Sequence, residues 1–134
     1  MPFRSLAPGV HVAGQIGLED LDEAAALGVR YVVSNRPDDE EPGQINAARF
    51  DTEAAARGLT FVHAPARGMP GPETVEAVDA VLATGEPVLL FCKSGLRSTA
   101  AWGMASVRSG RLGREEVLNG AAGAGYDLSS LPLG

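Results

Sequence analysis

The sequence predicts one α/β domain in which helices cover both faces of a parallel sheet. Segments of strand length alternate with segments of helical spacing along 134 residues, which is the size of one domain with its own core. Strands that alternate with helices pair in parallel through right-handed crossovers. The run Val88–Phe91 is apolar without polar alternation, as expected of a strand buried on both faces. We therefore expect residues 1–134 to form a single three-layer α/β/α domain.

Glycines mark the first strand and the first helix. Residues 11–15 are the first strand candidate, which Gly14 and Gly17 close. Residues 18–27 follow as a helix, because their leucines and alanines fall at the spacing of one buried side. Gly28 suits the position just after a helix, where a left-handed backbone is common.

Two further strands enclose an alanine-rich helix. Residues 29–34 are rich in β-prone side chains and predict the second strand. A polar loop at 38–43 contains turn-forming residues. The segment 45–57 is predicted as a helix that Gly58 ends, and residues 59–64 as the third strand.

The second half begins with an irregular loop at 65–72, rich in glycine and proline. Pro72 suits the first turn of a helix that continues toward the turn at Gly85, with valines and a leucine at core spacing. The remaining elements are the fourth strand at 88–91 and helices at 98–109 and 114–119. The tail from Gly120 is rich in small residues, and we assign it no firm structure.

The composition limits the compartment and the partners. One cysteine excludes an internal disulfide and argues against a cysteine-rich zinc site, so we expect a reducing cytoplasm and neither metal nor cofactor. The N-terminus lacks the apolar run of a signal peptide, and no stretch approaches the ~18 apolar residues of a membrane span. A net charge of −6 without a cluster of Lys and Arg argues against a nucleic-acid partner. The oligomeric state stays open.

A short loop between the fourth strand and the next helix carries the candidate chemistry. It starts at Cys92, ends at Arg97, and contains Lys93, Ser94, Gly95 and Leu96. Backbone N–H groups gather in such a loop at a helix N-terminus, where the helix dipole also favours negative charge. Cysteines in such positions have pKa values lowered to roughly 3.5–7.5. We predict that Cys92 is a nucleophile and that Arg97 and the loop bind an anionic substrate; the alternative is a small buried core cysteine.

Other candidate residues follow neighbouring strands, whose carboxyl ends meet at one edge of a parallel sheet. Arg36 follows the second strand and either binds substrate or pairs with the acidic residues beside it. Arg67 follows the third strand and is a candidate lid residue over the anion. His63 is more typical of a strand histidine with a satisfied hydrogen bond than of a catalytic one.

Five motifs together resemble one family. They are Ala13-Gly14-Gln15, Asn35-Arg36-Pro37-Asp38, Glu41-Pro42-Gly43-Gln44, Cys92-Lys93-Ser94-Gly95-Leu96-Arg97-Ser98 and Gly125-Tyr126-Asp127-Leu128. The chain resembles the phosphatase-like domain of the beta-lactamase hydrolase-like proteins, a bacterial group allied in fold to dual-specificity and tyrosine phosphatases. The resemblance implies a four-stranded parallel sheet, with Cys92 as nucleophile and Arg97 as anion clamp. It also implies that the Ser98 hydroxyl helps the thiolate to leave in the second half-reaction.

Three departures from the broader phosphatase pattern bear on the reaction. Four residues separate Cys92 from Arg97 instead of five, a length similar to single-domain rhodaneses, and Phe91 stands where the phosphatases have histidine. The loop 64–72, where those enzymes carry an aspartic general acid, contains no carboxylate. We rank Asp38 first as a replacement acid, ahead of three further carboxylates at Asp39, Glu40 and Glu73.

Three functions therefore stay open. The first is a cysteine phosphatase acting on a phosphomonoester through a thiophosphoryl intermediate on Cys92. The second is a rhodanese-like sulfurtransferase, which the loop length and the missing acid favour because a sulfite leaving group needs no proton. The third is a module that binds an oxyanion without turning it over.

Overall fold

Five strands form one sheet within residues 3–133, the part of the chain that this computed structural model describes. The strands are β1 (Arg4–Ala7), β2 (Val10–Ala13), β3 (Tyr31–Ser34), β4 (Thr60–His63) and β5 (Val88–Phe91). The helices are α1 (Asp20–Ala26), α2 (Ala47–Ala56), α3 (Pro72–Leu82), α4 (Leu96–Ser109) and α5 (Arg114–Gly123). The sheet order is β1-β2-β5-β3-β4, and every pair except β1 with β2 is parallel.

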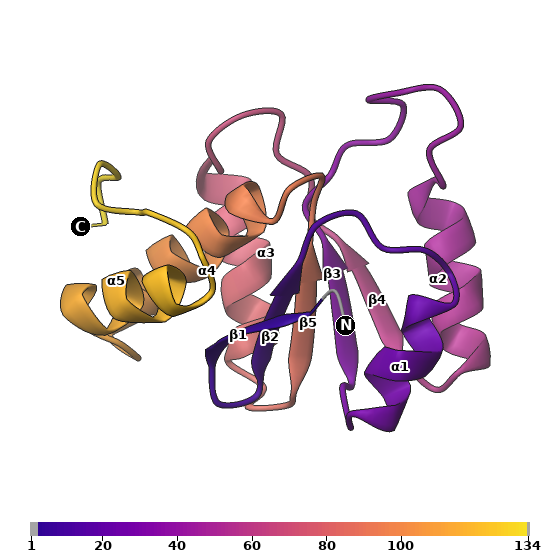
Figure 1. The fold of residues 1–134 in the computed structure, drawn as a ribbon, viewed down its shortest axis with the longest axis horizontal. Coiled ribbons are helices and arrows are strands. Elements are labelled where there is room, and N and C mark those ends of the chain that lie inside the picture. The colour runs from indigo at the N-terminus through magenta and orange to yellow at the C-terminus, as the bar shows by residue number, and fades with distance from the viewer. Residues whose placement is uncertain (1–2, 134) are drawn as a thin grey trace.

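Helices cover both faces of the sheet, with α1 and α2 on one side and α3, α4 and α5 on the other (Figure 1). The alternation of side chains along β5 explains the two layers. Val88 and Leu90 pack into the core formed with α3, α4 and α5, whereas Leu89 and Phe91 pack into the core formed with α1 and α2. All four residues are buried, so the strand predicted to be buried on both faces is confirmed.

The prediction of four strands missed β1, which pairs antiparallel with β2 at the edge of the sheet. Only Leu6 of its four residues is buried, and the pairing register shifts between Ser5 and Ala7. A strand with one buried side chain lacks the alternation that identifies strands in a sequence. The three-layer α/β/α class is unaffected, because an antiparallel edge strand on a parallel sheet is common.

The C-terminal part of the chain is more ordered than its composition indicated. Helix α5 continues to Gly123, four residues past the predicted end, and Gly120 packs so closely on the Leu6 carbonyl of β1 that a side chain has no room. The irregular segment after α5 buries Leu128 and Leu133, which are 1% and 2% exposed. The small residues therefore permit close packing of α5 on the sheet.

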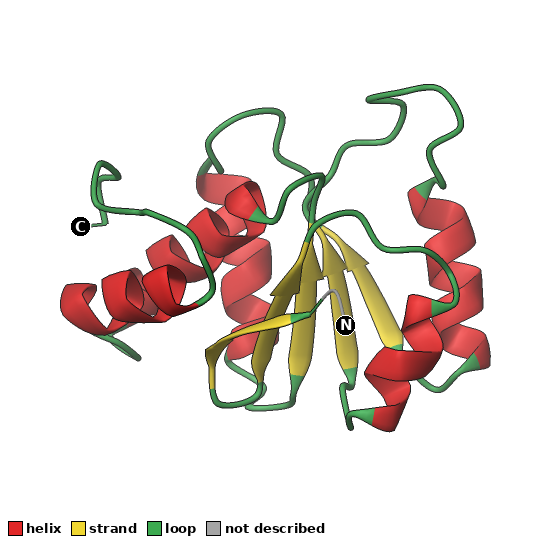
Figure 2. Cartoon of the chain, in the orientation of Figure 1, coloured by secondary structure: helices red, strands yellow, loops and turns green. Residues whose placement is uncertain are grey.

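The carboxyl ends of the parallel strands meet at one edge, toward which the strand arrows converge (Figure 2). The loops that follow β2, β3, β4 and β5 gather there, as the alternation of strands and helices predicted. No helix within residues 3–133 combines the length and the apolar character that a membrane crossing requires.

Candidate active site

Cys92 lies directly after β5 and receives a hydrogen bond from its own loop. The Gly95 N–H donates to the Cys92 Sγ at 3.1 Å, and Cys92 is fully buried. Gly95 makes this possible because its φ of +95° lies in the left-handed region, which residues with a Cβ rarely adopt. The sulfur therefore has an amide hydrogen aimed at it, as the anion-cradle prediction requires.

The rest of the loop is tied to segments outside it. The Lys93 carbonyl accepts from the Gln15 N–H at 3.0 Å, and the Ser94 carbonyl accepts from the Tyr126 hydroxyl at 2.8 Å. The Ser94 Oγ accepts from the Leu96 N–H at 3.3 Å. Lys93, Ser94 and Leu96 are exposed. Of the four predicted cradle residues, Gly95 donates to the sulfur, and Lys93 and Ser94 anchor the loop through their carbonyls.

Arg97, in the first turn of α4, is joined to a carboxylate rather than exposed to bulk water. Its Nη1 and Nη2 donate to the two Glu40 oxygens at 2.8 and 2.9 Å, and Nη1 also donates to the Ala66 carbonyl at 2.7 Å. The hydrogen bond to Glu40 raises the pKa of Arg97, and proximity to Cys92 adds to the rise. The predicted clamp thus lies beside the predicted nucleophile, with an internal carboxylate on it.

Glu40 connects two arginines of the site. Its Oε1 also accepts from the Arg36 Nε at 2.8 Å. The hydrogen bond from Arg97 chiefly lowers the Glu40 pKa, to about 2, and Arg36 acts in the same direction. Glu40 is therefore ionised at neutral pH and has no proton to give in this arrangement.

Arg36 is enclosed by protein partners. Its side chain is 2% exposed, and its three donor groups bond Glu40, the Glu41 carboxylate and the Gln15 side-chain oxygen, each at 2.8 Å. Of the two roles predicted for Arg36, the structure shows the pairing with the neighbouring acids Glu40 and Glu41. The same segment satisfies His63, whose Nε2 donates to the Arg36 carbonyl at 2.8 Å.

Ser98, for which the resemblance implied a role beside the sulfur, has Asn35 as its hydrogen-bond acceptor. It is fully buried, and its hydroxyl donates to the Asn35 Oδ1 at 2.7 Å. Asn35 in turn donates from Nδ2 to the Ala64 carbonyl at 2.8 Å. The Ser98 hydroxyl therefore donates to Asn35, and its help in the departure of the thiolate stays a prediction.

Asp38 and Arg67 lie beside the site without joining the Arg97 network. The Asp38 Oδ1 accepts from the Ala47 N–H at 2.8 Å and so supports the start of α2. Both residues are exposed and border a cavity of about 400 Å³, which is lined by Pro37, Asp38, Asp39, His63, Pro65 and Arg67. The structure thus places Glu40, rather than the first-ranked Asp38, against the clamp.

A matching family model covers residues 2–109, which include β1 through α4 and the whole Cys92–Arg97 loop. The model describes the phosphatase-like domain of the beta-lactamase hydrolase-like proteins. The chain belongs to this family.

Curated relatives place this phosphatase-like domain within longer proteins. A beta-lactamase hydrolase-like protein of Xylella fastidiosa (strain Temecula1) is 32% identical over 119 residues, and one of Agrobacterium fabrum is 29% identical over the same length. Each alignment covers 87% of this chain but 28% of the relative. The chain therefore spans less than a third of the length of these relatives.

Solved structures confirm the protein tyrosine phosphatase fold of the phosphatase-like domain. A candidate phosphatase from Neisseria meningitidis is 29% identical, superposes with a TM-score of 0.77, and the match covers 96% of this chain and 92% of that one. TpbA from P. aeruginosa, solved in complex with pTyr, is 17% identical with a TM-score of 0.65 over 93% of this chain and 75% of its own. The second likeness is one of fold.

Two departures of the phosphatase-like domain from that fold's usual pattern have structural counterparts. Phe91 packs against Phe50 with ring centroids 5.1 Å apart, inside the core next to α2. The loop after β4, which has no carboxylate, contacts Arg97 through the Ala66 carbonyl instead.

Sequence reasoning underrated three residues of the phosphatase-like domain. Glu40 was considered as an acid but not as the partner of Arg97, because a residue 57 positions away gives no local signal. Asn35 stood within a quoted motif without a role. Tyr126 stood within a quoted motif without a role, although a tyrosine among small residues is itself a signal of a specific contact.

Proposed function

We propose that this protein is a cysteine-dependent phosphatase-like hydrolase in which Cys92 attacks a phosphomonoester. One observation carries the proposal: the Cys92 sulfur, the Gly95 amide that donates to it and the Arg97 guanidinium lie together at the start of α4. A thiolate nucleophile beside fixed N–H donors and a cation suits a tetrahedral oxyanion.

The reaction would proceed in two steps, transfer of the phosphoryl group to Cys92 and its hydrolysis. The Cys92 sulfur attacks phosphorus, a P–S bond forms, and the bond from phosphorus to the leaving oxygen breaks. Water then attacks phosphorus, the P–S bond breaks, phosphate departs, and the thiolate is regenerated. The loop amides and Arg97 hold the non-bridging oxygens in both steps. The incoming anion has to displace the Glu40 carboxylate from Arg97 first, because both use the same two N–H groups.

The supply of a proton limits the substrate class. Glu40 is ionised, with a pKa of about 2, and the Asp38 carboxylate is bonded to the Ala47 amide. Loss of a positioned acid typically costs 10²–10⁴ in rate when the leaving group needs a proton. We therefore propose an aryl phosphate, whose oxygen departs without one. Asp38 is the candidate acid for other esters, provided that it leaves Ala47, and Arg67 is the candidate lid across the cavity that both border.

The length of the Cys92–Arg97 loop and the ionised carboxylate of Glu40 favour a second candidate, a sulfurtransferase. Four residues separate Cys92 from Arg97, as in single-domain rhodaneses, and the carboxylate on Arg97 carries no proton. The Cys92 thiolate would attack the outer sulfur of thiosulfate, the S–S bond would break, and sulfite would leave without protonation. The persulfide would then pass its outer sulfur to a nucleophilic acceptor.

Turnover of p-nitrophenyl phosphate, and separately of thiosulfate with cyanide, distinguishes the two. We expect hydrolysis of the aryl phosphate by the wild-type protein and its loss in Cys92→Ser. Arg97→Ala should lose about 10²–10³-fold in kcat/KM, the usual cost of removing one oxyanion donor. Arg57→Ala is the matched control, because Arg57 is also paired with carboxylates but lies between α1 and α2.

Each outcome of this comparison decides something. Turnover of thiosulfate alone would replace the phosphatase with the sulfurtransferase. Equal rates for wild-type and Cys92→Ser proteins on both substrates, with phosphate binding retained, would reject both reactions in favour of an oxyanion-binding module.

A further inference from the structure

One peptide unit of the Cys92 loop is held from both sides. The Ser94 carbonyl accepts from the Tyr126 hydroxyl at 2.8 Å. The N–H of the same peptide belongs to Gly95 and donates to the Cys92 Sγ at 3.1 Å. Tyr126 and the sulfur are therefore connected through a single peptide group.

The planarity of the peptide couples these two hydrogen bonds. In a trans peptide the C=O and N–H point in opposite directions, so a donor that holds the carbonyl outward also fixes the amide inward. A hydrogen bond to the carbonyl also polarises the N–H and strengthens its interaction with a negative acceptor. Both effects favour the Cys92 thiolate over the thiol, because hydrogen bonds to a charged form stabilise that form.

The approach of Tyr126 to this peptide is built into the fold. Gly95 has no side chain, and a Cβ there would collide with the Tyr126 hydroxyl. The segment that carries Tyr126 turns back past α4 after α5 (Figure 1) and is fixed by two contacts. The Arg4 Nη1 donates to the Ala124 carbonyl at 2.7 Å, and Leu128 is buried in the core.

We propose that Tyr126 is a positioning residue that aims the Gly95 amide at the Cys92 sulfur and so promotes thiolate formation. The inference rests on the proposed role of Cys92 as nucleophile. Burial raises the pKa of Tyr126, so its hydroxyl stays protonated and remains a donor near neutral pH. Tyr126 lies beyond residues 2–109, which match the family model.

Other charged groups lie around the loop and around Tyr126, and they have to stay constant in a test. They are Arg97 from α4 with Glu40 on it, Lys93 of the loop, Arg36 after β3 and Arg4 of β1, near Tyr126. Tyr126→Phe removes one hydroxyl and leaves every one of these charges in place.

The test is the rate of Cys92 alkylation by iodoacetamide as a function of pH, followed by intact mass. The rate follows the thiolate fraction, and Cys92 is the only cysteine in the chain. For Tyr126→Phe we expect the midpoint to move to higher pH, with a rate about three- to tenfold lower than wild type below that midpoint. Tyr31→Phe, which removes the only other tyrosine hydroxyl, should match the wild type.

The outcomes separate this inference from the proposed function. Superimposable wild-type and Tyr126→Phe profiles would overturn the role of Tyr126. An ordinary thiol midpoint near ~8.5 in the wild type would instead undermine the nucleophile itself. Near-ultraviolet circular dichroism checks that each variant is folded. Leu128→Ala supplies a second comparison, because it loosens the same segment but retains the hydroxyl. A rise in its midpoint equal to that of Tyr126→Phe would assign the effect to loosening and overturn the inference.

Discussion

At the scale of single residues, Glu40 fixes the positions of the two arginines of the site in the absence of substrate. Its carboxylate holds Arg97 with two hydrogen bonds and Arg36 with a third. An internal carboxylate thereby occupies the place that the proposed function gives to an oxyanion. The arrangement keeps two arginines charged and oriented beside a buried sulfur, at the cost of competition with the substrate.

The lowered pKa of Glu40 predicts a specific loss of stability in acid. The folded-state pKa of about 2 lies below the value of 4.5 for an unperturbed glutamate, which represents the unfolded chain. The stabilisation is therefore complete above about pH 4.5 and is lost as the pH falls through about 2. Glu40→Gln should unfold more easily at pH 7 by about 1 kcal/mol, a figure reduced for solvent screening of a partly exposed pair. Urea titrations from pH 2 to 7 measure this.

The difference between wild type and Glu40→Gln should vanish near pH 2. Glu86→Gln, at the opposite end of the sheet, is the control and should follow the wild type. A constant difference across the whole pH range would show that Glu40 acts through packing rather than through its charge.

At the scale of elements, the strand–loop–helix unit of β5 and α4 was the most predictable part of the molecule. Its apolar strand, its glycine and its arginine are adjacent in the chain, so the sequence predicted both the site and its place at the sheet edge. The partners of the loop were not predictable in this way. Gln15, Glu40 and Tyr126 reach it from distant parts of the sequence through tertiary packing. Strand β1 was not predictable either, because only its Leu6 side chain is buried.

Gly95→Ala tests the geometry of this loop. An alanine at position 95 would have to adopt the left-handed backbone of Gly95. Its Cβ would also meet the Tyr126 hydroxyl and, at 3.3 Å, the Ala13 carbonyl oxygen. We expect a loss of about 1–3 kcal/mol in unfolding free energy from the backbone conformation, with the collision in addition. Thermal and urea unfolding measure it.

Gly110→Ala is the matched control for the backbone cost alone. Gly110 also has a left-handed φ, of +78°, but a Cβ there meets nothing within 4 Å. Gly95→Ala should therefore be the more destabilising of the two. The double variant Gly95→Ala/Tyr126→Phe should recover part of the extra loss in unfolding free energy. Equal losses at the two glycines would contradict the close approach of Tyr126.

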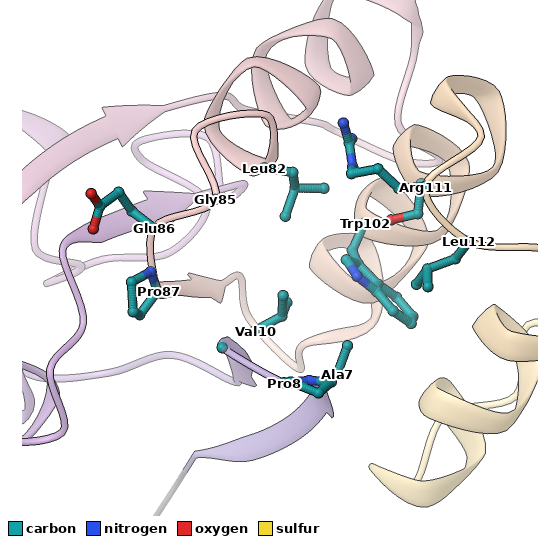
Figure 3. A pocket seen from close by; sticks show the side chains of 12 residues that line it. Ala7, Pro8, Val10, Leu82, Gly85, Glu86, Pro87, Trp102, Arg111 and Leu112 are labelled. Carbon is teal, nitrogen blue, oxygen red and sulfur yellow. The ribbon is translucent and has the colours of Figure 1, made fainter.

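At the scale of the whole molecule, β1 and the segment after α5 are joined to each other beside the Cys92 loop. Arg4 of β1 bonds Ala124, and the segment that follows carries Tyr126 to Ser94. In a protein with a net charge of −6, three of the eleven Lys and Arg residues belong to this site: Arg36, Lys93 and Arg97. A further cavity of about 370 Å³ opens at the other end of the sheet, where Trp102, Leu82 and Leu112 line it (Figure 3).

The burial of Leu128 predicts that the segment after α5 is part of the cooperative fold. Leu128→Ala removes a side chain that is 1% exposed and should cost about 2–5 kcal/mol in unfolding free energy. Leu131→Ala, at a half-buried position in the same segment, should cost clearly less. Chemical unfolding monitored at Trp102 provides the measurement, and equal small losses would mean that this segment unfolds independently.

The most direct test of the account is the intact mass of the protein during turnover. After rapid quenching with an aryl phosphate, we predict one added phosphoryl group that maps to Cys92 and is absent from Cys92→Ser. A single added sulfur atom after exposure to thiosulfate would instead identify the persulfide of the second candidate. An unmodified Cys92 during active turnover of either substrate would contradict covalent catalysis at this sulfur.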